Sequence, residues 1–363
     1  MNATTLETPT LDTAEAVRAA FALQRAAGLR AKDAAQAMGW SEGAVVQAHA
    51  GTHDAPMQVT PLRRGEWLQV LQALEPCGCV MALTRNESVV HEKEGVYRGL
   101  SQEGHVALCV NPDIDLRLFF MHWHAGYAVR EPGRSDVPLH SLQFFDAHGV
   151  AVHKVYARPA TDMQAWHALV ARFAQQDAQS TFAPAAPRTP VSAQSPVNAE
   201  ALRQAWAQMQ DTHAFFGLLK KFACERQQSF RLVQGTFTEA LSLHAVTDLL
   251  ERAAAAQTPI MVFVGSKGCI QIHTGPVQRI KAMEMENGQW LNVLDDGFNL
   301  HLRSDHIHNI WLVRKPTADG VVTSVEVFDA HGECVAMFFG ARKPGNPELP
   351  AWRALAESLE RQA

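Results

Sequence analysis

The chain has 363 residues, of which 47% are hydrophobic, and this length predicts two domains or one unit of double size. Its 32 basic and 37 acidic side chains give a net charge of −5, which argues against a protein whose main partner is a nucleic-acid backbone. Residues 1–20 lack the basic and apolar regions of a signal peptide, and no apolar run reaches the roughly 18 residues of a membrane span. We therefore expect a soluble, cytoplasmic protein without membrane insertion.

Helical periodicity covers residues 14–49. Within it, residues 31–46 follow a helix-turn-helix pattern with Gly39 in the turn and Ser41 as the N-cap. A helix that reads DNA needs polar and basic groups. The second helix of this pattern, after Ser41, has no Lys or Arg and offers only Glu42, Gln47 and His49. The pattern favours a structural helix pair, and nucleic-acid binding by a regulator is an alternative of a different class.

A further helix is predicted to end near Leu74, and strands follow it. The order recurs later, with helical periodicity over 198–233 and a helix that ends near Ala256. Apolar stretches rich in β-branched and aromatic residues indicate strands at 80–84, 142–145, 260–264 and 325–328. Helices followed by consecutive strands predict an α+β fold built on antiparallel sheets.

The chain repeats itself. The motif Phe-Asp-Ala-His-Gly at 145–149 recurs at 328–332, 183 positions later, and shorter matches recur at offsets of 184 and 185. We therefore predict a tandem duplication, in which each half is an N-terminal helical segment followed by a large antiparallel sheet and the two halves pack together. The predicted units are 1–176 and 198–363, joined by a linker rich in Pro, Ser and Ala at 177–197.

His213 marks a difference between the two copies, because the repeat aligns it with Gly28. At about 100° per residue, one face of the predicted helix collects Trp206, Met209, His213, Phe216, Gly217 and Lys220. The opposite face already supplies a core-facing stripe of Phe215, Leu218, Leu219 and Phe222. The His213 face is then a second apolar surface, which a flat ligand would cover.

Haem fits this face, because imidazole is a good iron ligand, Gly217 leaves space for a planar ring and Lys220 can reach a carboxylate at the ring edge. The alternative is a histidine that is simply packed and hydrogen-bonded in a two-domain protein. The helical pattern alone leaves both interpretations open.

Longer motifs carry a family resemblance. The chain resembles the HemS/ChuS/PhuS family of cytoplasmic haem-utilisation proteins, also called haemin-degrading factors, over nearly its whole length. The resemblance rests on Asp211-Thr212-His213-x-Phe215-Phe216, Arg226-Gln227-Gln228-x-Phe230, Thr84-Arg85-Asn86-Glu87, His91-Glu92, Leu116-Arg117-Leu118-Phe119, Asp162-Met163-x-x-Trp166 and Arg314-Lys315-Pro316-x-x-Asp319-Gly320.

The resemblance implies that haem lies between elements of both halves, with His213 as the proximal ligand of the metal and Arg117 on the distal, catalytic side. A guanidinium stays protonated and can orient a bound water or dioxygen. The resemblance also implies that haem propionates are contacted by basic residues, namely Arg226, Lys315 and Arg342. Where some members of the family have Tyr, this chain has Phe339, so a hydroxyl near the haem edge is absent.

Other candidate ligands are weaker. His91 lies in a family motif and is a candidate second haem contact, ranked below His213. The pairs His122-x-His124 and His306-x-His308 have a legitimate metal spacing, but lack further ligands nearby in the sequence. The six cysteines predict reduced thiols, and the pair at Cys77 and Cys79 lacks the second pair of a zinc site.

These observations give two hypotheses for one site. The first is a haem-binding protein of iron acquisition that passes haem onward, with a haem oxygenase or a haem-uptake transporter as its partner. The second is an enzyme that opens the haem ring and releases iron. Both use the same residues, and an oligomer is compatible with either.

Overall fold

The computed structural model describes residues 13–52, 55–133, 137–175, 180–183, 196–343 and 345–362. Most of the predicted linker at 177–197 lies outside these residues. The first half contains five helices and nine strands, namely α1 (Ala14–Ala26), α2 (Ala31–Ala37), α3 (Glu42–Ala48), β1 (Gln58–Pro61), α4 (Trp67–Gln72), β2 (Gly78–Arg85), β3 (Val89–Gly95), β4 (Ser101–Glu103), β5 (Val106–Val110), β6 (Asp115–Leu118), β7 (Ala125–Glu131), β8 (Leu139–Phe145), β9 (Ala151–Thr161) and α5 (Met163–Phe173).

The second half repeats this order element for element. Its helices and strands are α6 (Ala199–Ala207), α7 (Ala214–Lys221), α8 (Arg226–Leu232), β10 (Thr238–Leu241), α9 (Ala245–Ala255), β11 (Ile260–Gly265), β12 (Cys269–Gly275), β13 (Ile280–Met285), β14 (Gly288–Asp295), β15 (Phe298–Arg303), β16 (Ile307–Thr317), β17 (Gly320–Asp329), β18 (Cys334–Gly340) and α10 (Pro350–Glu357). The predicted α+β tandem duplication, its four strands and the helix ends near Leu74 and Ala256 are confirmed.

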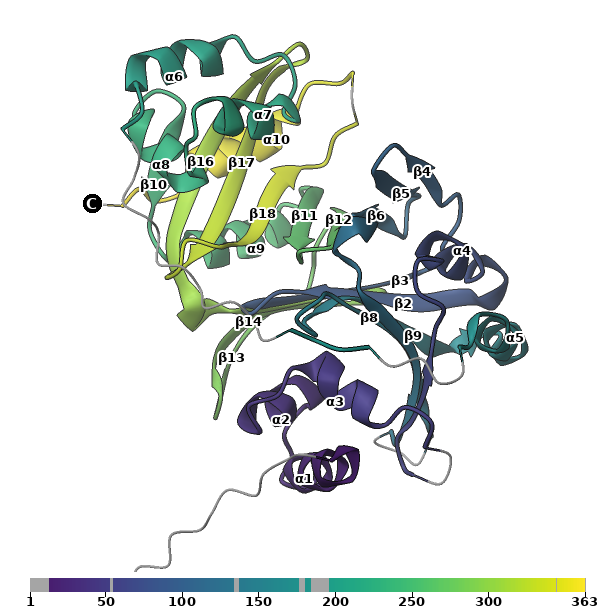
Figure 1. Cartoon of the computed structure of the whole chain (residues 1–363). Helices are drawn as coiled ribbons and strands as arrows, with labels where there is room; N and C mark the ends of the chain where they lie inside the picture. The colour runs from purple at the N-terminus through teal and green to yellow at the C-terminus, as the bar shows by residue number, and fades with distance from the viewer. Residues whose placement is uncertain are drawn as a thin grey trace, which may run out of the picture.

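The two halves exchange strands. One nine-stranded antiparallel sheet has the order β1-β7-β8-β9-β2-β3-β15-β14-β13, and the other has the order β10-β16-β17-β18-β11-β12-β6-β5-β4. Each sheet therefore joins six strands of one half to three strands of the other. At the two joins, Arg117 of β6 lies opposite Ile270, and His301 of β15 lies opposite Val90. The halves are interlocked by backbone hydrogen bonds as well as packed together (Figure 1).

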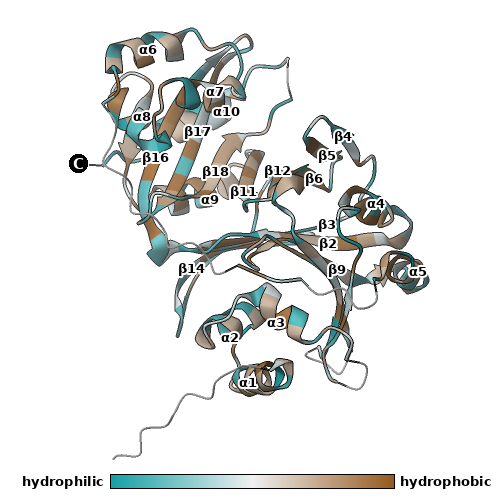
Figure 2. Ribbon diagram, viewed as in Figure 1, coloured by the Kyte–Doolittle hydropathy of each residue, from teal (hydrophilic) through white to brown (hydrophobic). Residues whose placement is uncertain are grey.

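The second sheet has one buried face and one partly open face. Along β11, Ile260, Val262 and Val264 are buried in the core that α9 and α10 cover. Met261 and Phe263 alternate with them and are only half-buried on the opposite face. This alternation follows from the two-residue period of a strand. Figure 2 shows the apolar character of β11 and β18 in this region.

The long helical segments predicted at 14–49 and 198–233 are each broken into three helices. In the second half, a turn at 208–213 separates α6 from α7, so Trp206 and His213 do not lie on one continuous helix. The predicted placement of Trp206 and Met209 beside His213 is therefore wrong, because both side chains are buried in the core of the helical bundle. In the first half, the breaks fall at Gly28 and Gly39, whose positive φ angles favour glycine.

The helix-turn-helix pattern forms the helix pair α2 and α3, with the Ser41 hydroxyl accepting a hydrogen bond from the Ala44 backbone N–H. Helix α3 packs against the turn between β8 and β9, where the Gly43 N–H donates to the Gly149 carbonyl at 2.9 Å. Glu42, Val45 and Val46 are buried in the same contact. Most of the helix that a DNA reader would present is therefore used for internal packing.

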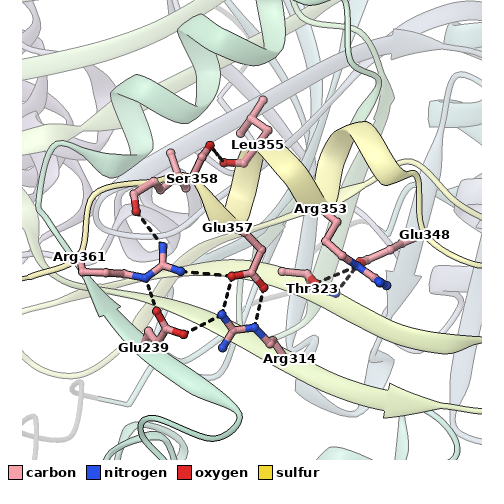
Figure 3. A network of polar contacts seen from close by, with 10 residues as sticks. Glu239, Arg314, Thr323, Glu348, Arg353, Leu355, Glu357, Ser358 and Arg361 are labelled. Carbon is pink, nitrogen blue, oxygen red and sulfur yellow. Dashed lines mark hydrogen bonds and ion pairs between the residues drawn. The ribbon is translucent and has the colours of Figure 1, made fainter.

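An ionic network fastens the C-terminal helix to the second sheet (Figure 3). Arg314 of β16 donates to Glu357 of α10 at 2.6 Å and to Glu239 of β10 at 2.7 Å, and Arg361 contacts both carboxylates. The network fixes β16, in which Lys315 directly follows Arg314. It therefore supports the sheet from behind the partly open face.

Candidate functional site

Helix α7 presents one exposed face. The side chains of His213 and Phe216 are 88% and 77% exposed, and a Cβ placed at Gly217 would meet no heavy atom within 4 Å. Lys220 is exposed on the same face, whereas Phe215 is buried on the opposite one. The predicted two-faced character of this short helix is thus present from His213 to Lys220.

The imidazole of His213 is held by a neighbouring carboxylate. The Oδ1 atom of Asp211 lies 2.7 Å from Nδ1 of His213 and accepts a hydrogen bond from the His213 backbone N–H at 2.8 Å. When Nδ1 carries the proton of this contact, Nε2 has a free lone pair. These hydrogen bonds from His213, the backbone N–H first, lower the pKa of Asp211. The exposed nitrogen is therefore available as a ligand.

Two of the three basic residues that the resemblance assigns to the haem propionates lie beneath α7. Arg226 forms a two-pronged ion pair with the buried Glu326 at 2.7 and 3.0 Å, and Lys315 reaches the same carboxylate at 2.8 Å. Both cations lie over the Phe215 ring, at 5.0 and 4.6 Å from its centre. Burial by itself would raise the pKa of Glu326, but Arg226 and Lys315 lower it to about 2. The cluster is ionised and fixes α7 over β16 and β17.

Arg342 lies on the loop after β18, where it donates to Asp319 at 2.9 Å. Asp319 lies in the hairpin turn between β16 and β17, next to Ala318, which contacts the turn that carries His213. That turn is tied to the hairpin of β16 and β17 by a hydrogen bond from the Ala318 N–H to the Gln210 carbonyl at 2.9 Å. The His213 end of the site is therefore built from three loops of the second half.

Arg117 enters the second sheet through the strand exchange. It lies opposite Ile270 of β12, which in turn lies opposite Gly265 of β11. A neighbouring row runs through Ile272, Phe263, Met337 and Glu326, each opposite the next, so Arg117 and Glu326 share one face of the sheet. Arg117 is 32% exposed and forms an ion pair with Asp115.

Between Arg117 and α7 lies an apolar surface, which we call the open face. Its side chains are half-buried, and they are Met261, Phe263, Ile270, Met337 and Phe339. A cavity of about 640 Å³ adjoins it, with Phe263, Ile270 and Met337 in its lining. Figure 1 shows α7 above β16 and β17 at one end of the sheet and β6 at the other, with β18, β11 and β12 between them.

His91 does not reach this site. It is fully buried at the join of the first sheet, its Nδ1 lies 2.9 Å from Nε2 of Gln271, and its ring packs against Phe298. The lower-ranked candidate His91 therefore lies inside the sheet, away from the exposed face of α7. Among the described residues, no group of three or more His, Cys, Asp or Glu side chains could hold a metal ion.

A family model for the haemin-degrading HemS.ChuX domain matches residues 39–173 and 223–359. The chain is 39% identical over 331 residues to the hemin transport protein HemS of Yersinia enterocolitica, covering 90% of this chain and 91% of that protein. The chain belongs to the haemin-degrading HemS/ChuX family. The two matched segments fall one in each half, in agreement with the duplication.

Solved structures of this family share the whole fold. The chain superposes on holo-PhuS, a heme-binding protein from Pseudomonas aeruginosa, with a TM-score of 0.89 and 44% identity, covering 96% of this chain and 100% of that one. It superposes on ChuS, an E. coli heme oxygenase, with a TM-score of 0.83 and 35% identity, covering 94% and 99% respectively. No helix among the described residues of this HemS/ChuX chain is long and apolar enough to cross a membrane.

Sequence reasoning missed two groups in this HemS/ChuX chain that the structure brings to the site. Glu326 forms ion pairs with both cations beneath α7, yet it is 100 residues from Arg226 in the chain. Asp211 lies only two residues before His213, and the Asp-x-His spacing is the local signal that could have revealed it. The first contact needed the tertiary structure, whereas the second could have been predicted.

Proposed function

We propose that this chain binds one haem through Nε2 of His213, with Arg117 on the opposite side of the ring, and serves the use of haem iron in the cytoplasm. The observation that carries the proposal is an exposed imidazole whose other nitrogen contacts Asp211 at 2.7 Å, next to an apolar open face. Relatives described as heme-binding and hemin transport proteins support the ligand class.

The described residues fit haem in shape and charge. The exposed Phe216 ring, the space at Gly217 and the open face provide apolar surface for the two sides of a porphyrin. We assign Lys220, exposed on the His213 face of α7, and Arg342 to the propionate groups at the ring edge, because both can form charge-assisted hydrogen bonds to a carboxylate. Arg226, 30% exposed, can contribute a further hydrogen bond, whereas Lys315 is 4% exposed and acts by holding Glu326 and α7 in place.

Arg117 is suited to the distal side. Its guanidinium stays charged and is oriented by Asp115, so it can donate hydrogen bonds to a small molecule beside the ring without competing as a ligand. Bound haem would supply the iron chemistry. The residues of this chain hold the ring and exclude water from its apolar surface. Arg117 donates hydrogen bonds from its nitrogen atoms to the small molecule beside the ring.

A haemin titration followed by absorption spectroscopy tests the binding proposal. Wild-type protein is expected to saturate at one haem per chain with a histidine-type Soret band, and His213→Ala is expected to lose that band and most of the affinity. His331→Ala, which removes an exposed histidine in the same half, is the matched control. An unchanged titration of His213→Ala would contradict the ligand assignment.

Onward transfer and degradation remain two candidate uses of this one site. The HemS relative is described as a transport protein and the ChuS relative as a heme oxygenase. We propose transfer to a haem oxygenase, after supply from a haem-uptake transporter, as the first candidate. The test loads the protein with haem without oxygen and then adds dioxygen, an electron donor and catalase. Intact haem that moves to an added haem oxygenase supports transfer, whereas a verdin-like product supports degradation.

A further inference from the structure

We propose that Asp211 is a positioning residue for His213, fixing its ring with Nε2 outward and strengthening the electron donation of that nitrogen to bound iron. This inference rests on the proposed haem binding through His213. It concerns a carboxylate that would not touch the haem and that acts only through the imidazole.

The geometry of the turn supports this role. One carboxylate oxygen of Asp211 contacts both the backbone N–H and Nδ1 of His213, at 2.8 and 2.7 Å. The Asp211 carbonyl also accepts from the Ala214 N–H at 3.1 Å, where α7 begins. The main chain and the side chain of Asp211 therefore set the position of the imidazole together, even though both side chains are mostly exposed.

The acceptor in this contact is a carboxylate, one oxygen of which lies 2.7 Å from Nδ1 of His213. A charged acceptor binds an N–H donor more strongly than a neutral one. The N–H of an iron-bound histidine that donates to a carboxylate fixes the ring tautomer and makes the ligating nitrogen more basic.

The competing interpretation is that Asp211 only stabilises the start of α7. Asparagine separates the two roles, because Asn accepts the same backbone hydrogen bond as well as Asp does but carries no charge. Asp211→Asn should therefore leave the folding of the free protein unchanged and weaken only the effect on the imidazole. Asp319→Asn separates effects that act through Arg342, because the Asp319 carboxylate accepts hydrogen bonds from Arg342 and from the Gly345 N–H. It can change haem affinity through Arg342 but should leave the iron–histidine frequency at its wild-type value.

The experiment compares wild type, Asp211→Asn, Asp211→Ala, Asp319→Asn and His213→Ala as full-length chains loaded with haemin. Three quantities are measured: the haem dissociation constant, the midpoint potential of the bound iron, and the iron–histidine stretching frequency of the ferrous form by resonance Raman. Thermal unfolding of the haem-free variants checks that each one folds.

We expect Asp211→Asn to weaken haem binding roughly 10–100-fold, the usual effect of losing an outer partner of a metal ligand. It should also lower the iron–histidine frequency and make the midpoint potential more positive, because a less basic imidazole stabilises ferric iron less. Wild-type values in Asp211→Asn, together with loss of haem in His213→Ala, would overturn the inference and leave the proposed function intact. Retained binding in His213→Ala would overturn both.

Discussion

Equivalent helix starts in the two halves carry different side chains. The second helix of each half begins after Arg30 in the first half and after His213 in the second. The third helix begins with Glu42 in one half and with Arg226 in the other. Glu42 is buried between Arg85 at 2.5 Å and Lys154 at 2.7 Å, whereas Arg226 reaches the buried Glu326. Each half therefore buries one carboxylate between two cations, but the third helix supplies the carboxylate in the first half and a cation in the second.

The sheet faces beneath these helices differ in the same way. The row Ile272, Phe263 and Met337 in the second sheet corresponds to Glu92, Leu83 and Lys154 in the first. An apolar ring laid on the first row would cover the partly exposed carboxyl of Glu92, which costs free energy when a polar group is removed from water without a partner. Burial already raises the pKa of Glu92. The duplicated backbone thus provides two equivalent frames, and under the proposed function the side chains on this row make the second frame the one suited to haem.

The largest expected effect comes from breaking the buried clusters. Glu326→Gln leaves Arg226 and Lys315 without their counter-charge, and we expect it to lower the free energy of unfolding by about 3–5 kcal/mol. Glu42→Gln should have an effect of the same order in the first half. Chemical denaturation measures both, with the exposed Glu200→Gln as control, where a change below about 1 kcal/mol is expected. If one of these two variants lost little free energy of unfolding and the other lost the expected amount, the two clusters would not be equivalent.

Lowering the pH should weaken the stabilisation by both clusters over the same pH range. The pKa values of Glu42 and Glu326 lie at about 2 instead of 4.5, because two cations beside each carboxylate outweigh the effect of burial. Their stabilisation is therefore complete above about pH 4.5 and is lost as the pH falls towards 2. Each group contributes about 3 kcal/mol by this linkage. Urea denaturation between pH 6 and pH 3 measures the loss, and the double variant Glu42→Gln, Glu326→Gln should show a flatter profile.

Met337→Lys makes the open face resemble its counterpart in the first half. Burying an unpaired neutral polar group costs about 1–3 kcal/mol and an ammonium costs more, so haem affinity should fall tenfold or more. A haemin titration measures this, and Met337→Leu should retain wild-type affinity because its side chain stays apolar. Equal affinities for the Lys and Leu variants would show that the apolar row does not distinguish the halves.

The smallest effect is expected at Phe216. Because its ring is 77% exposed, Phe216→Ala should change the stability of the haem-free protein by less than about 0.5 kcal/mol. Its haem affinity should nevertheless fall several-fold, because the ring would be covered on binding. Leu243→Ala, another exposed apolar residue of the second half, should change neither quantity. Loss of stability in Phe216→Ala would mean that the ring already packs in the free protein.

Local patterns in the sequence were sufficient for much of this protein. The duplication, the four predicted strands and the two faces of the segment from His213 to Lys220 came from residues close together in the chain or from the repeated motif. The family motifs added Arg117. Periodicity predicts such features because strand and helix geometry act over a few residues.

Only the tertiary structure decided what lies between those features. Exchange of β4–β6 and β13–β15 brings Arg117 into the sheet of the other half, and the same joins seal His91 away. Glu326 forms ion pairs with Arg226 and Lys315, two cations that the family resemblance assigned to haem propionates. Backbone pairing and buried charge pairing join residues far apart in the chain, so no local pattern records them.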